Sequence, residues 1–291
     1  MVLKKFHNFL KNERHYSIHT IRAYLYDVKV FFEFCSFQKY KPSLVTFNHI
    51  RLWVVDLKKN KQSAKTINRK ISSLKTFFNF CEREQFVTCN PILKLKSLKQ
   101  KKRLPIVVSE NSLRKLFTTS NIFSDDFSGK RDRLILDLFY QTGIRLSELI
   151  NIRLIDVIQD KKHLHIVGKR NKMRIIPLTS SILESLEIYL LVRNQVSSSS
   201  VYLFVTNKGK KTYAKMIYRL VKRYLSLVST VEKISPHVLR HAFATHLLNN
   251  GADLNAIKEL LGHSSLLSTQ IYTHVSSEKI KQEYSNSHPR G

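Results

Sequence analysis

Apolar residues recur at every third or fourth position through the first hundred residues, the spacing of amphipathic helices. The stretch "SIHTIRAYLYDVKVFFEFC" has this pattern after Ser17, a residue type that caps helices. Residues 63–85 show it again with Ile67, Ile71 and Leu74, and residues 47–60 predict a third helix between them. We therefore expect a small all-helical bundle. Its outer faces should carry the basic residues Lys65, Arg69, Lys70 and Lys75.

The pattern breaks at "NPILKLKSLKQKKRLP", which is rich in lysine and lies between two prolines. This composition is typical of an interdomain linker. We divide the chain into a helical domain at 1–96, a basic linker at 97–106 and a second domain at 107–291. The linker is expected either to follow a phosphate backbone or to remain a solvated charged segment.

The second domain mixes helices with a short stretch of strands. "KRDRLILDLFYQTG" predicts a helix stopped by Gly143, and "RLSELINI" a further helix. The apolar runs "LIDVI", "HLHIV" and "RIIPL" then predict three antiparallel strands with a lysine-rich hairpin. Helices return from Ser181 to the end, apart from "QVSSSS". The predicted fold class is mainly α with a small antiparallel β-sheet.

Charge is the least ordinary property of the composition. The 291 residues include 50 Lys and Arg against 21 Asp and Glu, a formal net charge of +29. Because both halves are basic, we expect both to touch a polyanion, with a surface that adheres to anionic lipid as the alternative.

Several classes of protein do not fit the chain. No apolar run approaches the ~18 residues that cross a bilayer, and the start lacks the apolar core of a signal peptide. We therefore expect a cytoplasmic protein without membrane contact. The three cysteines form no CxxC pair and no even set, which argues against disulfides or a thiolate zinc site.

The segment "ISPHVLRHAFATHLLNNG" predicts a helix with cationic side chains inside an apolar pattern. His237 and Arg240 are three residues apart and share one face of that helix. Gly251 ends it, Asp253 caps a helix over 254–261, and Gly262 ends that helix in turn.

A metal site and an anion site are the two readings of this cluster. His237 and His241 have the four-residue spacing of metal ligands, but no glutamate follows the first histidine and no third ligand has a motif, so we expect no metal. We interpret His241 and His246 as hydrogen-bonded core histidines. Arg240 needs an anion if it is buried, and Arg145, two residues after a helix stop, could supply a second phosphate-binding fork.

"TGIRLSEL", "VGKRNKMRIIPL", "HVLRHAFATHLL" and "LLGHSSLLSTQIYTHV" follow one another in the order Arg, Lys, His-x-x-Arg, His and Tyr. This ordered set closely resembles the tyrosine site-specific recombinases of the phage integrase family, nearest the Xer type. The resemblance extends through the first hundred residues. It implies a helical, SAM-like core-binding domain and an α+β catalytic domain that form a C-shaped clamp on duplex DNA.

The resemblance also implies roles for individual residues. Tyr272 would be the nucleophile that forms a 3′-phosphotyrosyl link, and no cofactor would be needed. His237 would act as base, His263 would hydrogen-bond the phosphate, and Lys169 would protonate the leaving 5′-oxygen. Arg145 and Arg240 would bind the non-bridging oxygens, with Glu148 fixing the Arg145 guanidinium. The residues expected to contact DNA are Lys65, Arg69, Lys75, Lys172 and Arg174.

The expected partners are a short, near-palindromic DNA site and three further copies of the chain, which exchange strands through a Holliday junction. The tail after Tyr272 would dock on a neighbouring copy. A paralogous recombinase and a DNA-translocating motor protein are further expected partners. Resolution of chromosome dimers is the favoured role. The alternatives are a mobile-element integrase, a topoisomerase, and a DNA-binding regulator that does not cleave.

Overall fold

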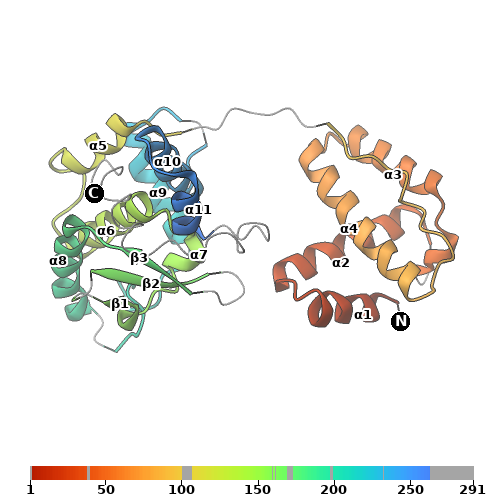
Figure 1. Cartoon of the computed structure of the whole chain (residues 1–291), viewed down its shortest axis with the longest axis horizontal. Helices are drawn as coiled ribbons and strands as arrows, with labels where there is room; N and C mark the ends of the chain where they lie inside the picture. The colour runs from red at the N-terminus through yellow and green to blue at the C-terminus, as the bar shows by residue number, and fades with distance from the viewer. Residues whose placement is uncertain are drawn as a thin grey trace. The chain divides into compact units, whose positions relative to one another are not determined.

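The fold is that of a computed structural model, which describes residues 2–37, 40–99, 107–158, 160, 162–168, 173–196, 199–231 and 233–262. The chain divides into two compact units, Met1–Leu104 and Pro105–Gly291, each with its own hydrophobic core (Figure 1). None of the helices in the described ranges is long and apolar enough to span a membrane.

The first unit contains only helices in its described residues. They are α1 (Val2–Asn8), the π-helical turn η1 (Phe9–Glu13), α2 (Ile18–Phe34), the 3-10 turn η3 (Pro42–Leu44), α3 (Phe47–Lys59) and α4 (Ala64–Arg83). The three helices predicted from the apolar spacing are thus α2, α3 and α4. Ser17 caps α2 as predicted, because its side chain accepts the N–H of Thr20 at 3.2 Å.

Aromatic rings hold this bundle together. Phe31 of α2 lies edge-on to Trp53 of α3, with ring centroids 5.1 Å apart, and Phe77 and Phe78 of α4 are fully buried beside them. The outer position predicted for Lys70 is wrong. Its side chain is buried, and its Nζ lies 5.6 Å from the centroid of the Trp53 ring. The apolar stem of a lysine packs well in such a place while its ammonium meets the negative ring face.

The second unit combines helices with the three predicted strands. Its elements are α5 (Glu110–Thr118), α6 (Phe127–Thr142), α7 (Leu146–Leu149), the 3-10 turn η4 (Leu154–Asp156), β1 (Val157–Ile158), β2 (His163–Val167), β3 (Met173–Pro177), α8 (Ser180–Val196), α9 (Ala214–Val228), α10 (Pro236–Asn249) and α11 (Leu254–Leu261). The sheet is antiparallel in the order β1-β2-β3, with His165 opposite Ile175. The predicted fold class is confirmed.

Three boundaries differ from the prediction. Helix α7 is a single turn, because Ile150 ends it, and residues 154–156 form a 3-10 turn before β1. The break after α8 extends to Tyr213, where isolated bridges such as Val205 to Lys211 replace helix. Short-range apolar spacing does not distinguish such extended segments from helix ends.

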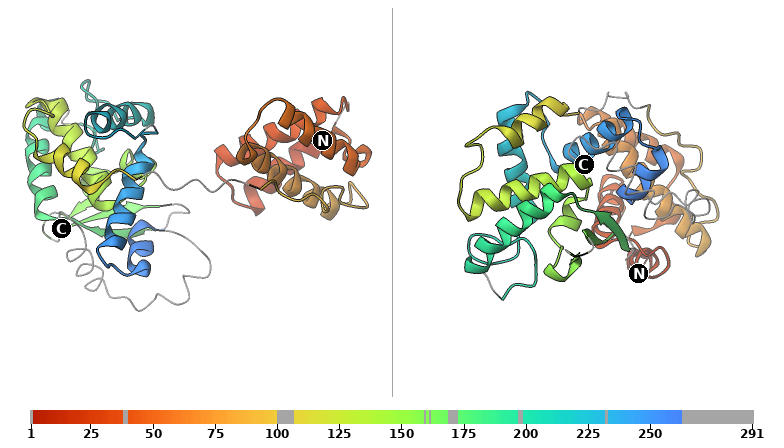
Figure 2. Two further views of the ribbon diagram at one scale, coloured as in Figure 1. Left: turned by 90° about the horizontal axis from the view of Figure 1, so that it is seen from above. Right: turned by 60° about the vertical axis from the view of Figure 1, so that its left-hand side comes forward.

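Helix α6 is the centre of the second unit. Every residue from Leu134 to Thr142 is buried, because α8 and α10 pack against this helix. Helix α6 therefore lies against the helix that carries His237 and Arg240: α10 packs on α6, and α11 lies beside β3 (Figures 1 and 2).

Candidate active site

Helix α10 carries the arginine and histidines that the sequence singles out. It begins at Pro236, whose missing N–H has no cost in the first helical turn. Leu239, Arg240 and Phe243 are buried on its inner face, whereas His237 is exposed. A buried guanidinium therefore lies one helical turn from an exposed imidazole.

His237 and His241 share the exposed face of α10, because residues four apart lie above one another on a helix. The core position predicted for His241 is therefore wrong. His246 is buried as predicted, with its Nδ1 3.2 Å from the Tyr140 hydroxyl, and burial lowers its pKa. The described residues hold no group of three or more His, Cys, Asp and Glu side chains suited to a metal ion.

The end of α6 places Arg145. Gly143 closes that helix in the left-handed region, with φ at 58°. A Cβ atom at this position would lie 2.5 Å from Cδ1 of Phe243 and 2.8 Å from Cδ2 of Leu261, so only glycine lets α6 end against α10 and α11. Arg145 is the N-cap residue of α7, and its backbone N–H donates to Oε2 of Glu148 at 2.8 Å.

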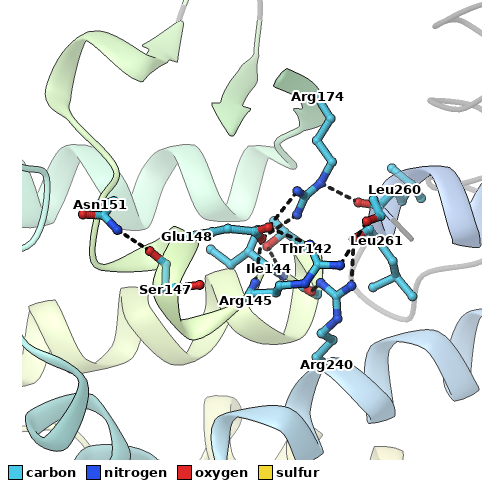
Figure 3. Close-up of polar contacts among 12 residues, drawn as sticks. Thr142, Ile144, Arg145, Ser147, Glu148, Asn151, Arg174, Arg240, Leu260 and Leu261 are labelled. Carbon is cyan, nitrogen blue, oxygen red and sulfur yellow. Dashed lines mark hydrogen bonds and ion pairs between the residues drawn. The ribbon is translucent and has the colours of Figure 1, made fainter. Parts of the chain in front are cut away.

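Three successive carbonyl groups at the end of α11 each accept a hydrogen bond from a different arginine (Figure 3). The carbonyls of Leu260, Leu261 and Gly262 bind, in that order, Arg174, Arg240 and Arg145 at 2.9, 2.7 and 3.0 Å. The last carbonyls of a helix lack intrahelical partners and carry partial negative charge, so guanidinium groups bind them well. Side chains from α7, β3 and α10 thus meet at one helix end, and we call these three arginines with Glu148 the arginine cluster.

Glu148 is the carboxylate of this cluster. Its two oxygens accept from Nη1 and Nη2 of Arg174 at 3.0 and 2.7 Å, and Nη1 of Arg145 donates to Oε1 at 2.7 Å. Burial alone would raise the pKa of Glu148, but the hydrogen bonds from Arg174 and from the Arg145 amide outweigh it and lower the pKa to about 2. The carboxylate is therefore ionised at neutral pH.

Arg240 is the most deeply buried arginine of the cluster. It is 9% exposed, and its Nη1 donates to the carbonyl of Gly143 at 2.5 Å. Burial lowers its pKa to about 10, and the nearby charges of Arg145 and Arg174 act in the same direction. The group stays protonated at neutral pH, so three guanidinium groups face one carboxylate. An anion that can offer two oxygens to one guanidinium, such as a phosphodiester, would compensate this positive charge.

The other residues predicted for catalysis lie outside the described residues, namely Lys169, His263 and Tyr272, as does Lys172 of the predicted DNA contacts. One link to them is nevertheless visible. Gly262, whose carbonyl Arg145 binds, directly precedes His263 in the sequence. The arginine cluster therefore surrounds the point at which the chain leaves α11.

Three residues predicted to contact DNA lie on α4 of the first unit. Lys65 is exposed and Lys75 is half-buried. Arg69 binds both carboxylate oxygens of Asp27, with its Nη2 at 3.0 Å from Oδ1, and this buried aspartate also accepts from the Ser73 hydroxyl at 2.7 Å. The role of these three residues in DNA binding stays a prediction.

The sequence analysis missed the main role of Arg174 in the structure. It assigned Arg174 to the DNA-facing hairpin, whereas the structure pairs it with Glu148. The strand period contains the missing signal. Along β3, Met173 and Ile175 are exposed, while Arg174 and Ile176 point to the other, buried side.

Comparisons with known proteins cover both units. The model of the phage integrase family matches residues 107–279, and that of its N-terminal SAM-like domain matches residues 3–85. The chain is 37% identical over 293 residues to tyrosine recombinase XerC of Thermodesulfovibrio yellowstonii, across 99% of this chain and 96% of that protein. It is 36% identical to tyrosine recombinase XerD of Staphylococcus saprophyticus, across 99% of each.

Solved structures share the fold. The XerH recombinase in a post-cleavage complex with its palindromic difH substrate matches with a TM-score of 0.72 and 22% identity, over 97% of this chain and 83% of that one. A lambda integrase dimer bound to a core site matches with a TM-score of 0.70 and 17% identity, over 95% and 98%.

Proposed function

The chain belongs to the phage integrase family, and we propose that it is a site-specific recombinase that cleaves and rejoins DNA through a 3′-phosphotyrosyl intermediate. The family resemblance read from the motifs is thereby confirmed. The observation that carries the proposal is the arginine cluster, in which three guanidinium groups and one carboxylate converge on the end of α11. Such a cluster suits a phosphodiester, whose negative charge grows during attack.

Cleavage would be a transesterification at the scissile phosphorus. The Tyr272 oxygen attacks the scissile phosphorus, a bond from phosphorus to the tyrosine oxygen forms, and the bond to the 5′-oxygen breaks. The phenol proton leaves to a base, and the departing 5′-oxygen gains a proton. The products are a 3′-phosphotyrosyl strand and a free 5′-hydroxyl. Because the phosphotyrosyl link is itself a phosphodiester and conserves the bond energy, a 5′-hydroxyl from another strand can attack it, release the tyrosine and rejoin the DNA without ATP.

Proton transfer requires groups on both sides of the phosphorus. A tyrosine with an ordinary pKa of about 10 is largely protonated at neutral pH, so its proton must be removed as it attacks. His237, exposed one turn before Arg240, would accept that proton. Lys169 would protonate the 5′-oxygen, and His263 would hydrogen-bond the phosphate.

Two arginines of the arginine cluster would bind the non-bridging oxygens. Arg145 approaches from the start of α7 and Arg240 from the inner face of α10, and Glu148 holds the Arg145 guanidinium at 2.7 Å. Hydrogen bonds already formed with Glu148 and with the α11 carbonyls keep both side chains in place before substrate arrives. Preorganised donors of this kind cost no reorganisation when charge develops.

We further propose that the substrate is duplex DNA at a short, near-palindromic site, bound by both basic units in the cytoplasm. Four copies would assemble on two sites, and the biological role would be resolution of chromosome dimers. The names of the relatives, XerC and XerD, support an Xer-type role, and the net charge of +29 supports a polyanionic partner. A paralogous recombinase and a motor protein belong to the same proposal.

Covalent trapping tests the chemistry. The protein is incubated with fragmented chromosomal DNA of its source in EDTA and denatured, and DNA attached to protein is isolated and its ends sequenced. We expect adducts with the wild-type protein and none with the Tyr272→Phe variant, which keeps the ring and lacks the nucleophile. A set of recovered ends that share one short inverted repeat would identify the site.

Three outcomes would contradict the proposal or its biological role. Tight, sequence-selective DNA binding without adducts, even on nicked duplexes built on the bound sequence, would indicate a regulator that does not cleave. Adducts without any joint molecules between two DNA duplexes would indicate a topoisomerase. Ends recovered at the border of a mobile element, in place of a single chromosomal site, would replace dimer resolution by integration.

A further inference from the structure

Arg174 binds two segments that are distant in the sequence. Its Nη1 and Nη2 donate to the two oxygens of Glu148, and its Nε donates to the carbonyl of Leu260 (Figure 3). Glu148 belongs to α7, Leu260 to α11, and Arg174 itself to β3. One guanidinium group therefore joins three elements.

We propose that Arg174 is a positioning residue of this site, which holds Glu148 and the end of α11 together and thereby sets the place of the Arg145 guanidinium. It acts through its partners and does not itself bind the phosphate. The inference rests on the proposed recombinase function for its consequence in catalysis. The contacts themselves do not depend on that function.

Arg174 is more deeply buried than Arg145. The Arg174 side chain is 12% exposed against 30% for Arg145, so Arg145 offers more of its surface to a ligand. Gly262 covers Arg174 on one side, since a Cβ atom there would lie 3.1 Å from Nη1 and 3.2 Å from Cδ of Arg174. The Glu148 carboxylate accepts hydrogen bonds from both Nη atoms of Arg174, so it occupies the edge of the guanidinium that could otherwise bind a phosphate.

Two consequences follow from this position. Without Arg174, Glu148 would keep Arg145 as its one remaining arginine partner in the described residues, and the carboxylate could rotate away from it. The carbonyl of Leu260 would also lose its donor, two residues before Gly262, to which Arg145 is bound. Both changes would loosen Arg145, a group whose alignment matters for charge stabilisation in the transition state.

A first experiment measures the positioning itself and needs no DNA. Hydrogen exchange of the full chain is compared between the wild type, Arg174→Gln and the control Arg131→Gln. Arg131 is also a buried arginine of the second unit, paired with Asp132 at 2.8 Å, but it lies about 18 Å along α6 from Gly143. We expect Arg174→Gln to raise exchange at 143–149 and 254–262, and the control to leave both peptides unchanged.

A second experiment measures cleavage on a nicked duplex built on the site recovered by trapping. We expect Arg174→Gln to bind DNA with the affinity of the wild type and to form adduct at least about tenfold more slowly, the usual loss when a partner of a functional group is removed. In a Glu148→Gln background the same substitution should slow adduct formation by less than about threefold, because the ionised carboxylate through which Arg174 acts is already absent.

The pH profile separates positioning from a loss of folded protein. The carboxylate of Glu148 stays ionised in the wild type, because Arg174 is the strongest of the groups that lower its pKa. Without that partner, burial is opposed by fewer hydrogen bonds, so the pKa of Glu148 rises from about 2 and the ratio of variant to wild-type rate should fall further as the pH decreases. The folded fraction is measured by circular dichroism at each pH and the rates are divided by it, so that a loss of folded protein does not contribute to the ratio.

Several results would overturn the inference. These are an Arg174→Gln protein that cleaves within twofold of the wild type, equal losses in both backgrounds, or unchanged exchange at 254–262. If Arg174→Gln does not fold, Arg174→Lys serves in its place, because an ammonium cannot bind both carboxylate oxygens in one plane. Full activity of that variant would contradict the proposal. A wild-type protein that forms no adduct would remove the recombinase function, while the exchange experiment would still decide whether Arg174 positions the site.

Discussion

The guanidinium of Arg240 donates to the carbonyl of Gly143, 97 positions earlier in the sequence, at 2.5 Å. This contact joins the residue that ends α6 to the inner face of α10. It places a buried positive charge beside the backbone turn that leads to Arg145. Arg240 therefore belongs both to the site and to the contact between α6 and α10.

Replacement of Arg240 by methionine should uncouple activity from stability. We expect adduct formation to fall roughly 10²–10³-fold, the usual loss when a preorganised donor to the reacting centre is removed. The free energy of unfolding should fall only by about 1–3 kcal/mol, because a desolvated charge disappears together with its hydrogen bonds to two carbonyls. Single-turnover cleavage and urea denaturation measure the two quantities. Loss of activity that merely tracks the unfolded fraction would contradict this expectation.

Gly143 and Gly251 form a matched pair for a packing test. Both have positive φ, 58° and 87°, but a Cβ at Gly143 would lie 2.5 Å from the Phe243 ring, whereas one at Gly251 would have nothing within 4 Å. We expect Gly251→Ala to lower the free energy of unfolding by about 1–2 kcal/mol through backbone strain alone. Gly143→Ala should cost about 1–3 kcal/mol more, through overpacking. If denaturant unfolding showed the same loss of free energy for both variants, the neighbouring helices would be able to move aside at no measurable cost.

The free energy of unfolding at acid pH should depend on the ionisation of Glu148. Its pKa is lowered from the ordinary value of 4.5 to about 2 in the folded chain. The folded state therefore binds fewer protons, and the ionised carboxylate stabilises the fold above the unfolded pKa. That contribution, at most about 3 kcal/mol, is lost as the pH falls from about 4.5 towards 2. The difference in unfolding free energy between the wild type and Glu148→Gln should shrink over this interval. A difference that does not vary with pH would be evidence against it.

The pair formed by Asp27 and Arg69 should respond asymmetrically. Asp27 is fully buried, whereas the Arg69 side chain is 46% exposed. Arg69→Gln leaves a buried carboxylate without its cation and should cost about 3–5 kcal/mol. Asp27→Asn leaves a cation that water can solvate and should cost about 1.5–3 kcal/mol. The double variant should be more stable than Arg69→Gln alone, and thermal unfolding of all three tests this order.

The Arg69 variants also bear on DNA binding. A DNA affinity measured for Arg69→Gln is meaningful only at a temperature at which the first unit is folded. Lys65→Gln, on the exposed side of the same helix, provides the comparison, because it removes a charge without breaking an ion pair among the described residues. If Lys65 meets the phosphate backbone, its loss should reduce the salt dependence of binding by about one counterion.

Local signals in the sequence determined most of the helices and the sheet. Apolar residues three and four apart predict α2, α3 and α4, and Ser17 and Asp253 cap helices as predicted. Gly143 and Gly262 end α6 and α11 in the left-handed conformation that glycine permits. Each of these features depends on a residue and its neighbours within about one helical turn, so they can be predicted without knowledge of the fold. The ordered motifs likewise identified the family.

Only the tertiary structure decided which charges meet. The convergence of Arg145, Arg174 and Arg240 on three successive carbonyls of α11 spans 117, 86 and 21 positions of sequence, and no local pattern contains it. The same holds for Lys70 against Trp53, and for the exposed face of His241. The physical reason is that a charged side chain adopts the contacts of lowest free energy that are within its reach once the elements have packed. That choice depends on which helix end or carboxylate the packing brings within about 3 Å, and not on its neighbours along the chain.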